Sequence, residues 1–298
     1  MKEDEMINAL TIDVEDYFHV SAFESVSAPD SWDGRELRVE RNTEKMLAIL
    51  DEVGVKATFF VLGWVAQKMP QLVRLIAAQG HEVASHGFGH RRLCFLGRKE
   101  FREDIRHSKT ILEDLTGCAV QGYRAPSYSI SEKTPWAFDE LWAADFRYDS
   151  SVFPVRHDFY GLADWPRFQG RAVRFENGTW GPAADAAPGQ ATLMEVPIST
   201  LEFGSQRVPI AGGGYFRLYP YGVTRWGLRR INRIDNRPFI FYLHPWEIDP
   251  DQPRLRGAGL KSTFRHYLNL HRTEARFRRL VQDFHFAPVA EGLKGWTA

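Results

Sequence analysis

Cysteine is scarce in this chain. Its 298 residues include only two cysteines, Cys94 and Cys118, and these do not form a Cys-x-x-Cys pair. Two separate thiols cannot build a disulfide scaffold, and they are typical of proteins that fold in a reducing compartment.

Long apolar runs and an excess of charge of one sign are also absent. No stretch reaches membrane-spanning length, and the acidic start at residues 1–6 has no apolar core of signal-peptide length. The formal net charge is zero, which gives no indication of a nucleic-acid or anionic-membrane partner. We therefore expect a cytoplasmic protein without a membrane span, or a periplasmic one if a leader was removed from this sequence.

Two further signatures are missing. The glycine run Gly212–Gly214 is not followed by Lys and Ser or Thr, so it is not a phosphate-binding loop. No internal repeat occurs at the periods that mark solenoid proteins. What remains is an ordinary globular composition, with 44% hydrophobic and 26% charged residues, at a length that suits one large α/β domain with an extension.

Short apolar segments alternate with helical patterns along most of the chain. We expect an N-cap at Asn42 and another at Thr273, each starting a helix. The expected strands are 7–13, 55–62, 81–85, 120–123, 146–150 and 238–243. Strands that alternate with helices predict a parallel sheet with βα crossovers.

Residues whose side chains can bind a metal or transfer a proton recur directly after these strands. Active sites of (β/α) barrels lie at that rim, so this placement favours a barrel, with an open doubly wound sheet as the alternative. Residues 158–189 are rich in Pro, Gly, Ala and Trp and are expected to form an irregular insertion. We expect a catalytic domain over 1–250 and a C-terminal extension over 251–298 that packs on it.

The pair His86 and His90 is the most informative feature. Two imidazoles four residues apart can bind one metal ion, and the small residues Gly87 and Gly89 suit a tight ligand loop. The acidic cluster Asp13–Asp16 follows an earlier strand and offers a third ligand and a spare carboxylate. Zinc with three protein ligands and an open position is a hydrolytic site, because its bound water becomes a nucleophile near neutral pH.

The candidate residues that follow the expected strands also have purely structural interpretations. The acidic cluster could be solvated or lie at a helix start, and Arg124 could form an ordinary salt bridge. Asp149 could cap a turn, and His244 could be a hydrogen-bonded core histidine. These interpretations do not explain why all of the residues follow separate strands.

Together, these segments resemble the polysaccharide deacetylase (NodB-homology) family, whose five motifs occur here in order over roughly residues 7–249. The matching segments are Thr11–Asp16, His86–His90, Arg124–Pro126, Tyr148–Ser151 and Leu243–His244. The phrases Asp13–Val20 and Phe264–Leu270 further resemble the subgroup associated with exosortase-linked exopolysaccharide loci. The first motif departs from the usual adjacent carboxylates, because Val14 separates Asp13 from Glu15.

The resemblance implies a distorted (β/α) barrel of about seven strands and a metal-dependent N-deacetylase. It implies that Asp13 is the general base and that His86, His90 and either Glu15 or Asp16 bind the metal, most plausibly Zn²⁺. The remaining residues for which the resemblance suggests roles are Arg124, which orients the base, His244, the general acid, and Asp149, its tuning partner.

The expected substrate is an N-acetylated oligo- or polysaccharide. A backbone N–H near Ser127 is expected to help hold the oxyanion, with Tyr128 beside it. Exposed aromatics could stack on sugar rings, and the candidates are Tyr128, Trp180, Tyr215 and Trp246. Two alternatives stay open at this point: an allantoinase-like amidohydrolase on a small cyclic amide, and an inactive glycan-binding homologue.

Overall fold

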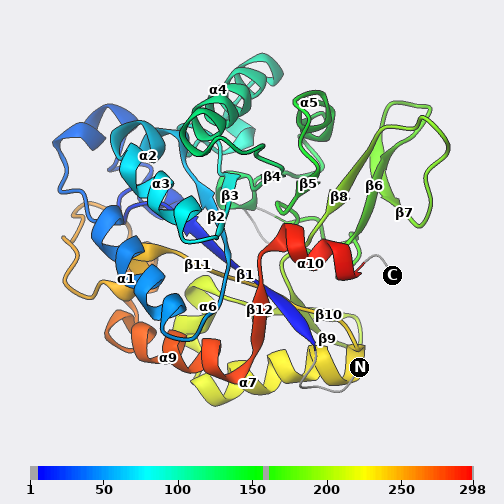
Figure 1. Ribbon diagram of the computed structural model, residues 1–298. Helices are drawn as coiled ribbons and strands as arrows, with labels where there is room; N and C mark the ends of the chain where they lie inside the picture. The colour runs from blue at the N-terminus through cyan, green and yellow to red at the C-terminus, as the bar shows by residue number, and fades with distance from the viewer. Residues whose placement is uncertain (1–5, 157–160, 297–298) are drawn as a thin grey trace. The chain divides into compact units, whose positions relative to one another are not determined.

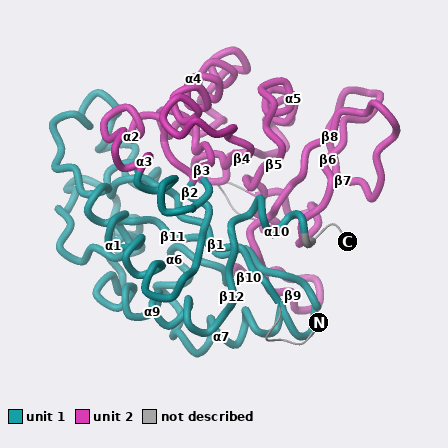
Figure 2. Tube along the Cα trace, viewed as in Figure 1, with its two compact units in different colours: residues 1–59, 75–82, 210–298 teal, residues 60–74, 83–209 magenta. Residues whose placement is uncertain are grey.

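The computed structural model describes residues 6–156 and 161–296 of the chain (Figure 1). The described chain divides into two compact units, coloured separately in Figure 2. Unit 1 contains residues 1–59, 75–82 and 210–298, and unit 2 contains residues 60–74 and 83–209. The C-terminal residues beyond 250, expected to form an extension, thus belong to the same unit as the first strand.

Unit 1 is built from three parallel strands and the helices around them. The strands are β1 (Ile7–Val14), β11 (Ile240–Leu243) and β12 (His285–Ala287). The α-helices are α1 (Val39–Asp51), α6 (Gly213–Leu218), α7 (Tyr221–Arg230), α8 (Leu260–Tyr267), α9 (Leu270–Asp283) and α10 (Val289–Trp296). The shorter helical segments are η2 (Ser21–Phe23), η3 (Pro29–Gly34), η6 (Ile231–Asp235) and η7 (Pro245–Ile248).

Strand β1 is the centre of this unit. It pairs in parallel with β11 and with β12, and all but its first residue are buried. A strand buried on both faces is typical of parallel sheets that are covered by helices. The register places Ile12 opposite Leu243, so the residues that follow this pair, Asp13 and His244, lie side by side.

The run Gly212–Gly214 allows α6 to begin against β11. Gly212 has a φ of 125° and forms a bridge with Tyr242, and a Cβ at Gly212 would lie 2.0 Å from the Tyr242 carbonyl oxygen. A Cβ at Gly213 would meet the Tyr242 ring. Only glycine fits this close approach. The glycine run, which is not a phosphate-binding loop, therefore has a packing role.

Unit 2 contains a mixed sheet, a separate hairpin and three helices. Its strands are β4 (Gly122–Tyr123), β5 (Tyr148–Asp149), β6 (Gly170–Arg174), β7 (Trp180–Ala183), β8 (Thr192–Glu195), β9 (Thr200–Phe203) and β10 (Gln206–Pro209). Its helices are α2 (Gly63–Lys68), α4 (Arg98–Thr116) and α5 (Ala137–Ala143), with short turns η4 (Leu93–Phe95) and η5 (Pro126–Tyr128). Three elements have residues in both units: β2 (Thr58–Val61), α3 (Pro70–Ala78) and β3 (Glu82–Ser85).

The parallel part of the unit 2 sheet is in register at one level. Ser85 of β3 pairs with Tyr123, Tyr123 with Asp149, and Asp149 with Glu195. Strand β8 then pairs antiparallel with β6, and β6 with β7. Because the parallel strands end together, the residues that follow them meet at one edge of the sheet.

The predicted α/β class with parallel strands and helices is confirmed. Within each unit the strand order is open, so closure into a barrel stays a prediction. The first residues of the irregular insertion expected at 158–189 lie outside the described residues, up to residue 160. Its later part is not irregular, because it contains the antiparallel pair β6–β7. Tertiary pairing with β8 organises a segment whose local composition indicates a loop.

Two predicted helix caps are wrong. Helix α1 begins at Val39, before Asn42, whose side chain instead bonds to the Asp249 carboxylate at 3.1 Å. Helix α9 begins at Leu270, and the Thr273 hydroxyl bonds back to the Asn269 carbonyl within it. In the part of the chain that the structure describes, no helix is long and apolar enough to cross a membrane.

A buried histidine links the pH dependence of stability to this fold. The Ala57 amide donates to His81 Nδ1 at 3.1 Å, so this nitrogen of the ring must carry no proton. Burial, and then the charge of Lys56, lower the pKa of His81 to about 4. In the unfolded chain the ring regains an ordinary pKa, so between about pH 6.5 and 4 the unfolded state binds the extra proton. Stability is therefore fully present above pH 6.5 and falls as the pH drops toward 4.

We predict that His81→Gln reduces the loss of unfolding free energy between pH 7 and pH 4.5 by roughly 2 kcal/mol relative to the native chain. Urea unfolding at the two pH values measures this difference. His285→Gln, at an exposed histidine of the same unit, is the matched control and should leave the difference unchanged. An unchanged difference in His81→Gln would contradict the assignment.

Candidate active site

Asp13 and His244 lie close together near the ends of neighbouring strands in unit 1. The His244 Nε2 atom lies 3.9 Å from Asp13 Oδ2 and 3.4 Å from Glu15 Oε1. Both carboxylates are buried, and His244 is only partly accessible. The parallel register of β1 and β11 accounts for this proximity, as predicted from the strand positions.

The other ring nitrogen of His244 is held by Glu247. His244 Nδ1 lies 2.6 Å from Glu247 Oε1, and the same oxygen accepts the His244 backbone N–H at 3.1 Å. Arg217 of α6 donates its Nε to the second Glu247 oxygen at 2.6 Å. Glu247, three residues after His244, thus holds this ring nitrogen. The tuning role that the resemblance implies for Asp149 stays a prediction.

This arrangement favours a charged imidazole. Burial by itself lowers the pKa of His244, but Glu15, Glu247 and Asp13 together raise it to about 9. Burial alone would likewise raise the pKa of Glu247, but Arg217 and His244 lower it. Glu247 is therefore an ionised carboxylate that fixes the ring and keeps a proton on Nδ1.

An aromatic stack supports His244 from one side. Trp246 lies parallel to His244 with ring centroids 5.2 Å apart, and His266 lies parallel to Trp246 at 4.2 Å. The Trp246 indole N–H donates to Glu15 Oε1 at 3.2 Å. Trp246 is therefore a buried support for the acid–base group, and the sugar-stacking role considered for it does not fit its 3% exposure.

Asp16 has a structural position. Its Oδ2 accepts the backbone N–H groups of Arg38 at 2.6 Å and Val39 at 2.9 Å, at the start of α1. Its Oδ1 accepts the Tyr17 N–H at 2.9 Å. Burial raises the pKa of Asp16 to about 6, although these three amides lower it. Both oxygens are engaged by backbone donors, whereas Glu15 points toward His244, so the two acidic residues have different surroundings.

In unit 2 a chain of hydrogen bonds connects the residues that follow successive strands. His86 Nδ1 bonds to the Arg124 carbonyl at 2.8 Å. The Arg124 guanidinium donates to the Ser150 carbonyl at 3.2 Å and to the Ser150 hydroxyl at 2.9 Å, and that hydroxyl donates to the Val196 carbonyl at 2.8 Å. Fully buried Arg124 also lies 4.1 Å from the centre of the Phe60 ring.

The bond from His86 fixes its tautomer. A carbonyl oxygen only accepts, so the proton lies on Nδ1 and the Nε2 lone pair is available to a metal. The His90 ring lies 5.4 Å from the His86 ring, centre to centre, at an interplanar angle of 62°. Two imidazoles at this separation, one oriented through its outer nitrogen, fit the donor set of a divalent metal of the zinc type.

The loop between these histidines is shaped by Asp104 of α4. Its carboxylate accepts the Phe88 N–H at 2.7 Å and the Gly89 N–H at 3.3 Å. Gly87 has a φ of 73°, and a Cβ there would lie 2.8 Å from Asp104 Oδ2. Asp104 is thus a supporting residue that the sequence analysis did not identify, because it lies on a helix 14 residues beyond His90.

Asp149 stabilises the neighbouring loop. Its Oδ1 accepts the Ser151 hydroxyl at 2.6 Å, while the Ser151 oxygen accepts the Ala125 N–H at 2.7 Å. Glu195 lies next to Asp149 and accepts the Val152 N–H at 3.1 Å. Burial, and then the nearby Asp149, raise the pKa of Glu195 well above its usual range. In unit 2, Asp149 therefore holds the segment that begins with Arg124 and Ala125.

Ser127 and Tyr128, expected near the oxyanion, have unusual backbones. Their φ angles are 54° and 53°, values that non-glycine residues rarely adopt and that cluster at functional sites. The Tyr128 ring packs edge-on against Phe153 at 5.5 Å. Among the aromatics considered for sugar stacking, Tyr128 and Trp180 are buried and Tyr215 is half-buried.

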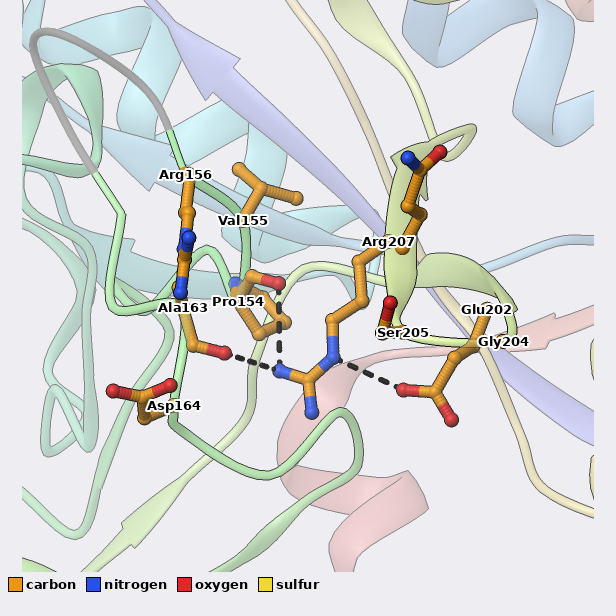
Figure 3. A pocket seen from close by; sticks show the side chains of 10 residues that line it. Pro154, Val155, Arg156, Ala163, Asp164, Glu202, Gly204, Ser205 and Arg207 are labelled. Carbon is orange, nitrogen blue, oxygen red and sulfur yellow. Dashed lines mark hydrogen bonds and ion pairs between the residues drawn. The ribbon is translucent and has the colours of Figure 1, made fainter.

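A separate cavity of about 810 Å³ lies in unit 2 beside the hairpin β9–β10 (Figure 3). Arg207 projects into it and donates to the carbonyl oxygen of Ala163 at 2.7 Å and to Glu202 at 3.1 Å. None of the predicted site residues lines this cavity. Arg207 is already bonded to the protein itself, and we assign this cavity no part in the chemistry.

Two family models match the chain. A model described as polysaccharide deacetylase matches residues 30–142, and a model described as a domain of unknown function (DUF3473) matches residues 150–294. The second family model begins directly after β5 and ends within α10, and so includes His244 and Glu247.

Curated proteins with related sequences match a shorter part. The peptidoglycan-N-acetylglucosamine deacetylase of Bacillus cereus is 37% identical over 109 residues, which is 35% of this chain and 40% of that protein. The chitooligosaccharide deacetylase of Sinorhizobium fredii is 40% identical over 100 residues, which is 33% of this chain and 44% of that protein. The match spans less than half the length of either relative.

The fold is also similar to a solved structure. A candidate polysaccharide deacetylase from Mycobacterium smegmatis superposes with a TM-score of 0.57 over 97% of this chain and 88% of that one. The identity of 20% makes this a likeness of fold.

The position of Asp16 leads to a stability prediction. Asp16→Ala removes the acceptor for three backbone amides, two of them at the start of α1, and should lower the free energy of unfolding by about 2 kcal/mol. Asp30→Ala, at an exposed aspartate in the same unit, should change it by less than about 0.5 kcal/mol. Urea unfolding measures both, and equal small effects would show that Asp16 does not stabilise the helix start.

Proposed function

We propose that this chain is a polysaccharide deacetylase of the NodB-homology type and that it hydrolyses the N-acetyl amide of amino sugars in an oligo- or polysaccharide; the family model and the curated relatives that it matches support this proposal. The observation that carries this proposal is the pairing of Asp13 with His244 at the ends of adjacent parallel strands. Amide hydrolysis needs both groups, because water must lose a proton and the departing amine must gain one.

We propose that His86 and His90 bind a divalent metal, zinc, with one carboxylate of the Asp13–Asp16 segment. The orientation of His86 by the Arg124 carbonyl supports this assignment. Glu15 is the preferred carboxylate, because both Asp16 oxygens accept backbone N–H groups. Such a metal, when bound, polarises the amide carbonyl and acidifies water near neutral pH.

The proposed steps use residues of this chain in sequence. Asp13 accepts the proton of the attacking water. His244, held at Nδ1 by Glu247, carries a second proton on Nε2 and donates it to the amine as the C–N bond breaks. Arg124 positions the loop that begins with Ala125, and the backbone N–H of Ser127 helps to hold the developing oxyanion.

The substrate follows from the names of the relatives. Those relatives are deacetylases of peptidoglycan N-acetylglucosamine and of chitooligosaccharide, so we propose a polymer that contains N-acetylated glucosamine or a similar sugar. The resemblance to the exosortase-linked subgroup supports a proposed role in exopolysaccharide biosynthesis. An inactive homologue is disfavoured, because Asp13, His244 and the histidine pair are all present.

Acetate release tests the function. The zinc-loaded chain should release acetate from N-acetylglucosamine oligomers and leave allantoin intact. Asp13→Asn should reduce kcat about 10²–10⁴-fold with the metal retained, because it removes the general base. Asp114→Asn, at an exposed position on α4, is the control and should match the native rate. Hydrolysis of allantoin without acetate release from the oligomers would establish the small-amide alternative.

Comparison of an amide with an activated ester tests His244. An aryl acetate leaves without a proton, whereas the amine does not, so His244→Ala should lose about 10²–10⁴-fold on the acetamide and less than about tenfold on the ester. Glu247→Gln should show the same selectivity with a smaller loss. His271→Ala, an exposed histidine, should be neutral on both. Equal losses on the two substrates would mean that His244 binds substrate or supports the fold.

A further inference from the structure

Positive charge is concentrated on α7 and the π-helical turn η6 that follows it. Residues 221–237 contain five arginines, which are Arg225, Arg229, Arg230, Arg233 and Arg237, and one acidic residue, Asp235. The whole chain has a formal net charge of zero. This segment therefore holds a local excess that the overall charge conceals. Figures 1 and 2 place α7 at the lower edge of unit 1.

Large apolar side chains are exposed among these arginines. Val223 is 43% exposed, Trp226 52% and Ile234 66%. Residues 223, 226, 230, 233 and 234 follow helical spacing and so share one side of the segment. Leu228 and Ile231 face the core instead. The outward side thus combines aliphatic, aromatic and guanidinium groups.

The same side contains a shallow cavity of about 450 Å³. Its lining includes Arg225, Arg229, Arg230 and Arg233, with Trp226 and Ile234 beside them. Guanidinium groups around a concave surface are suited to phosphate, which they bind by charge and by paired hydrogen bonds. The Asp283 carboxylate of α9 pairs with Arg225 at 3.2 Å, and Asp235 lies on η6 itself. The positive charge still exceeds the negative charge.

We propose that the α7–η6 surface docks on an anionic phospholipid bilayer, with the arginines on lipid phosphates and Val223, Trp226 and Ile234 at the boundary of the acyl chains. Interfacial helices combine these groups in this way. A nucleic acid would use the arginines but offers no apolar layer for Val223 and Ile234, so charge and apolar exposure together favour lipid.

The fold gives this docking a definite direction within unit 1. Asn232 of η6 bonds to the Asn8 side chain at 2.8 Å, which ties the surface to the start of β1. Asp13 lies near the opposite end of β1, and His244 directly follows β11. Docking through α7–η6 therefore leaves the acid–base pair on the side of unit 1 away from the bilayer, where a polymer can reach it.

Vesicle co-sedimentation tests the proposal. The full chain should sediment with vesicles of equal parts phosphatidylglycerol and phosphatidylcholine, remain in solution with pure phosphatidylcholine, and dissociate as salt is added. The double variant Arg229→Gln, Arg233→Gln should bind the anionic vesicles about 25-fold more weakly, since each cation near the surface contributes about fivefold. Trp226→Ala should weaken binding at unchanged charge.

The control is the double variant Arg74→Gln, Arg106→Gln, which removes the same charge from exposed arginines of α3 and α4. It should bind as the native chain does. Absence of binding to anionic vesicles, or equal losses in the two double variants, would overturn the proposal. So would tighter binding to a DNA duplex that anionic vesicles do not displace. Acetate release from soluble oligomers should be the same in both double variants, so that failure of docking is distinguishable from failure of the proposed function.

Discussion

The register of the parallel strands is the constraint on which the candidate site depends. In unit 1, pairing of Ile12 with Leu243 places Asp13 and His244 side by side. In unit 2, pairing through Ser85, Tyr123 and Asp149 does the same for His86, Arg124 and Ser150. Side chains with opposite chemical roles are brought together by backbone hydrogen bonds, and a one-residue slip would turn each of them to the other face.

Burial then determines how these groups behave. A buried imidazolium tends to lose its proton and a buried carboxylate tends to gain one. Either group, if it were isolated in this site, would therefore become neutral. Glu247 prevents this loss of charge. It lies between Arg217 and His244, and both of them lower its pKa. Breaking such a group by removing one partner leaves an uncompensated charge in the interior. The network therefore keeps His244 charged and oriented in one position.

The sequence was informative wherever a local pattern determines the outcome. Alternation of strands and helices predicted the α/β class, and the residues after β1, β3 and β11 could be found by their position alone. Contacts from distant segments could not be found in that way. Asp104 supports the histidine loop from α4, Arg217 reaches Glu247 from α6, and Asp16 replaces Asn42 at the start of α1. Glu247 lies three residues after His244, and a 3₁₀ turn brings its side chain back to the His244 ring. This contact could be found only once the turn was known. Net charge was also a poor guide, because it averages the arginines of α7–η6 with acidic residues elsewhere.

Anomalous diffraction from zinc-soaked crystals tests the central claim most directly. Data collected on the two sides of the zinc absorption edge locate the metal without reference to activity. The account predicts one strong peak bonded to Nε2 of His86, to His90 and to a Glu15 carboxylate oxygen, at about 2.0–2.2 Å from each. A peak on Asp16 in place of Glu15 would correct the ligand set. A peak that avoids His86 and His90, or none at all in the soaked crystals, would contradict the proposal that this chain is a metal-dependent deacetylase.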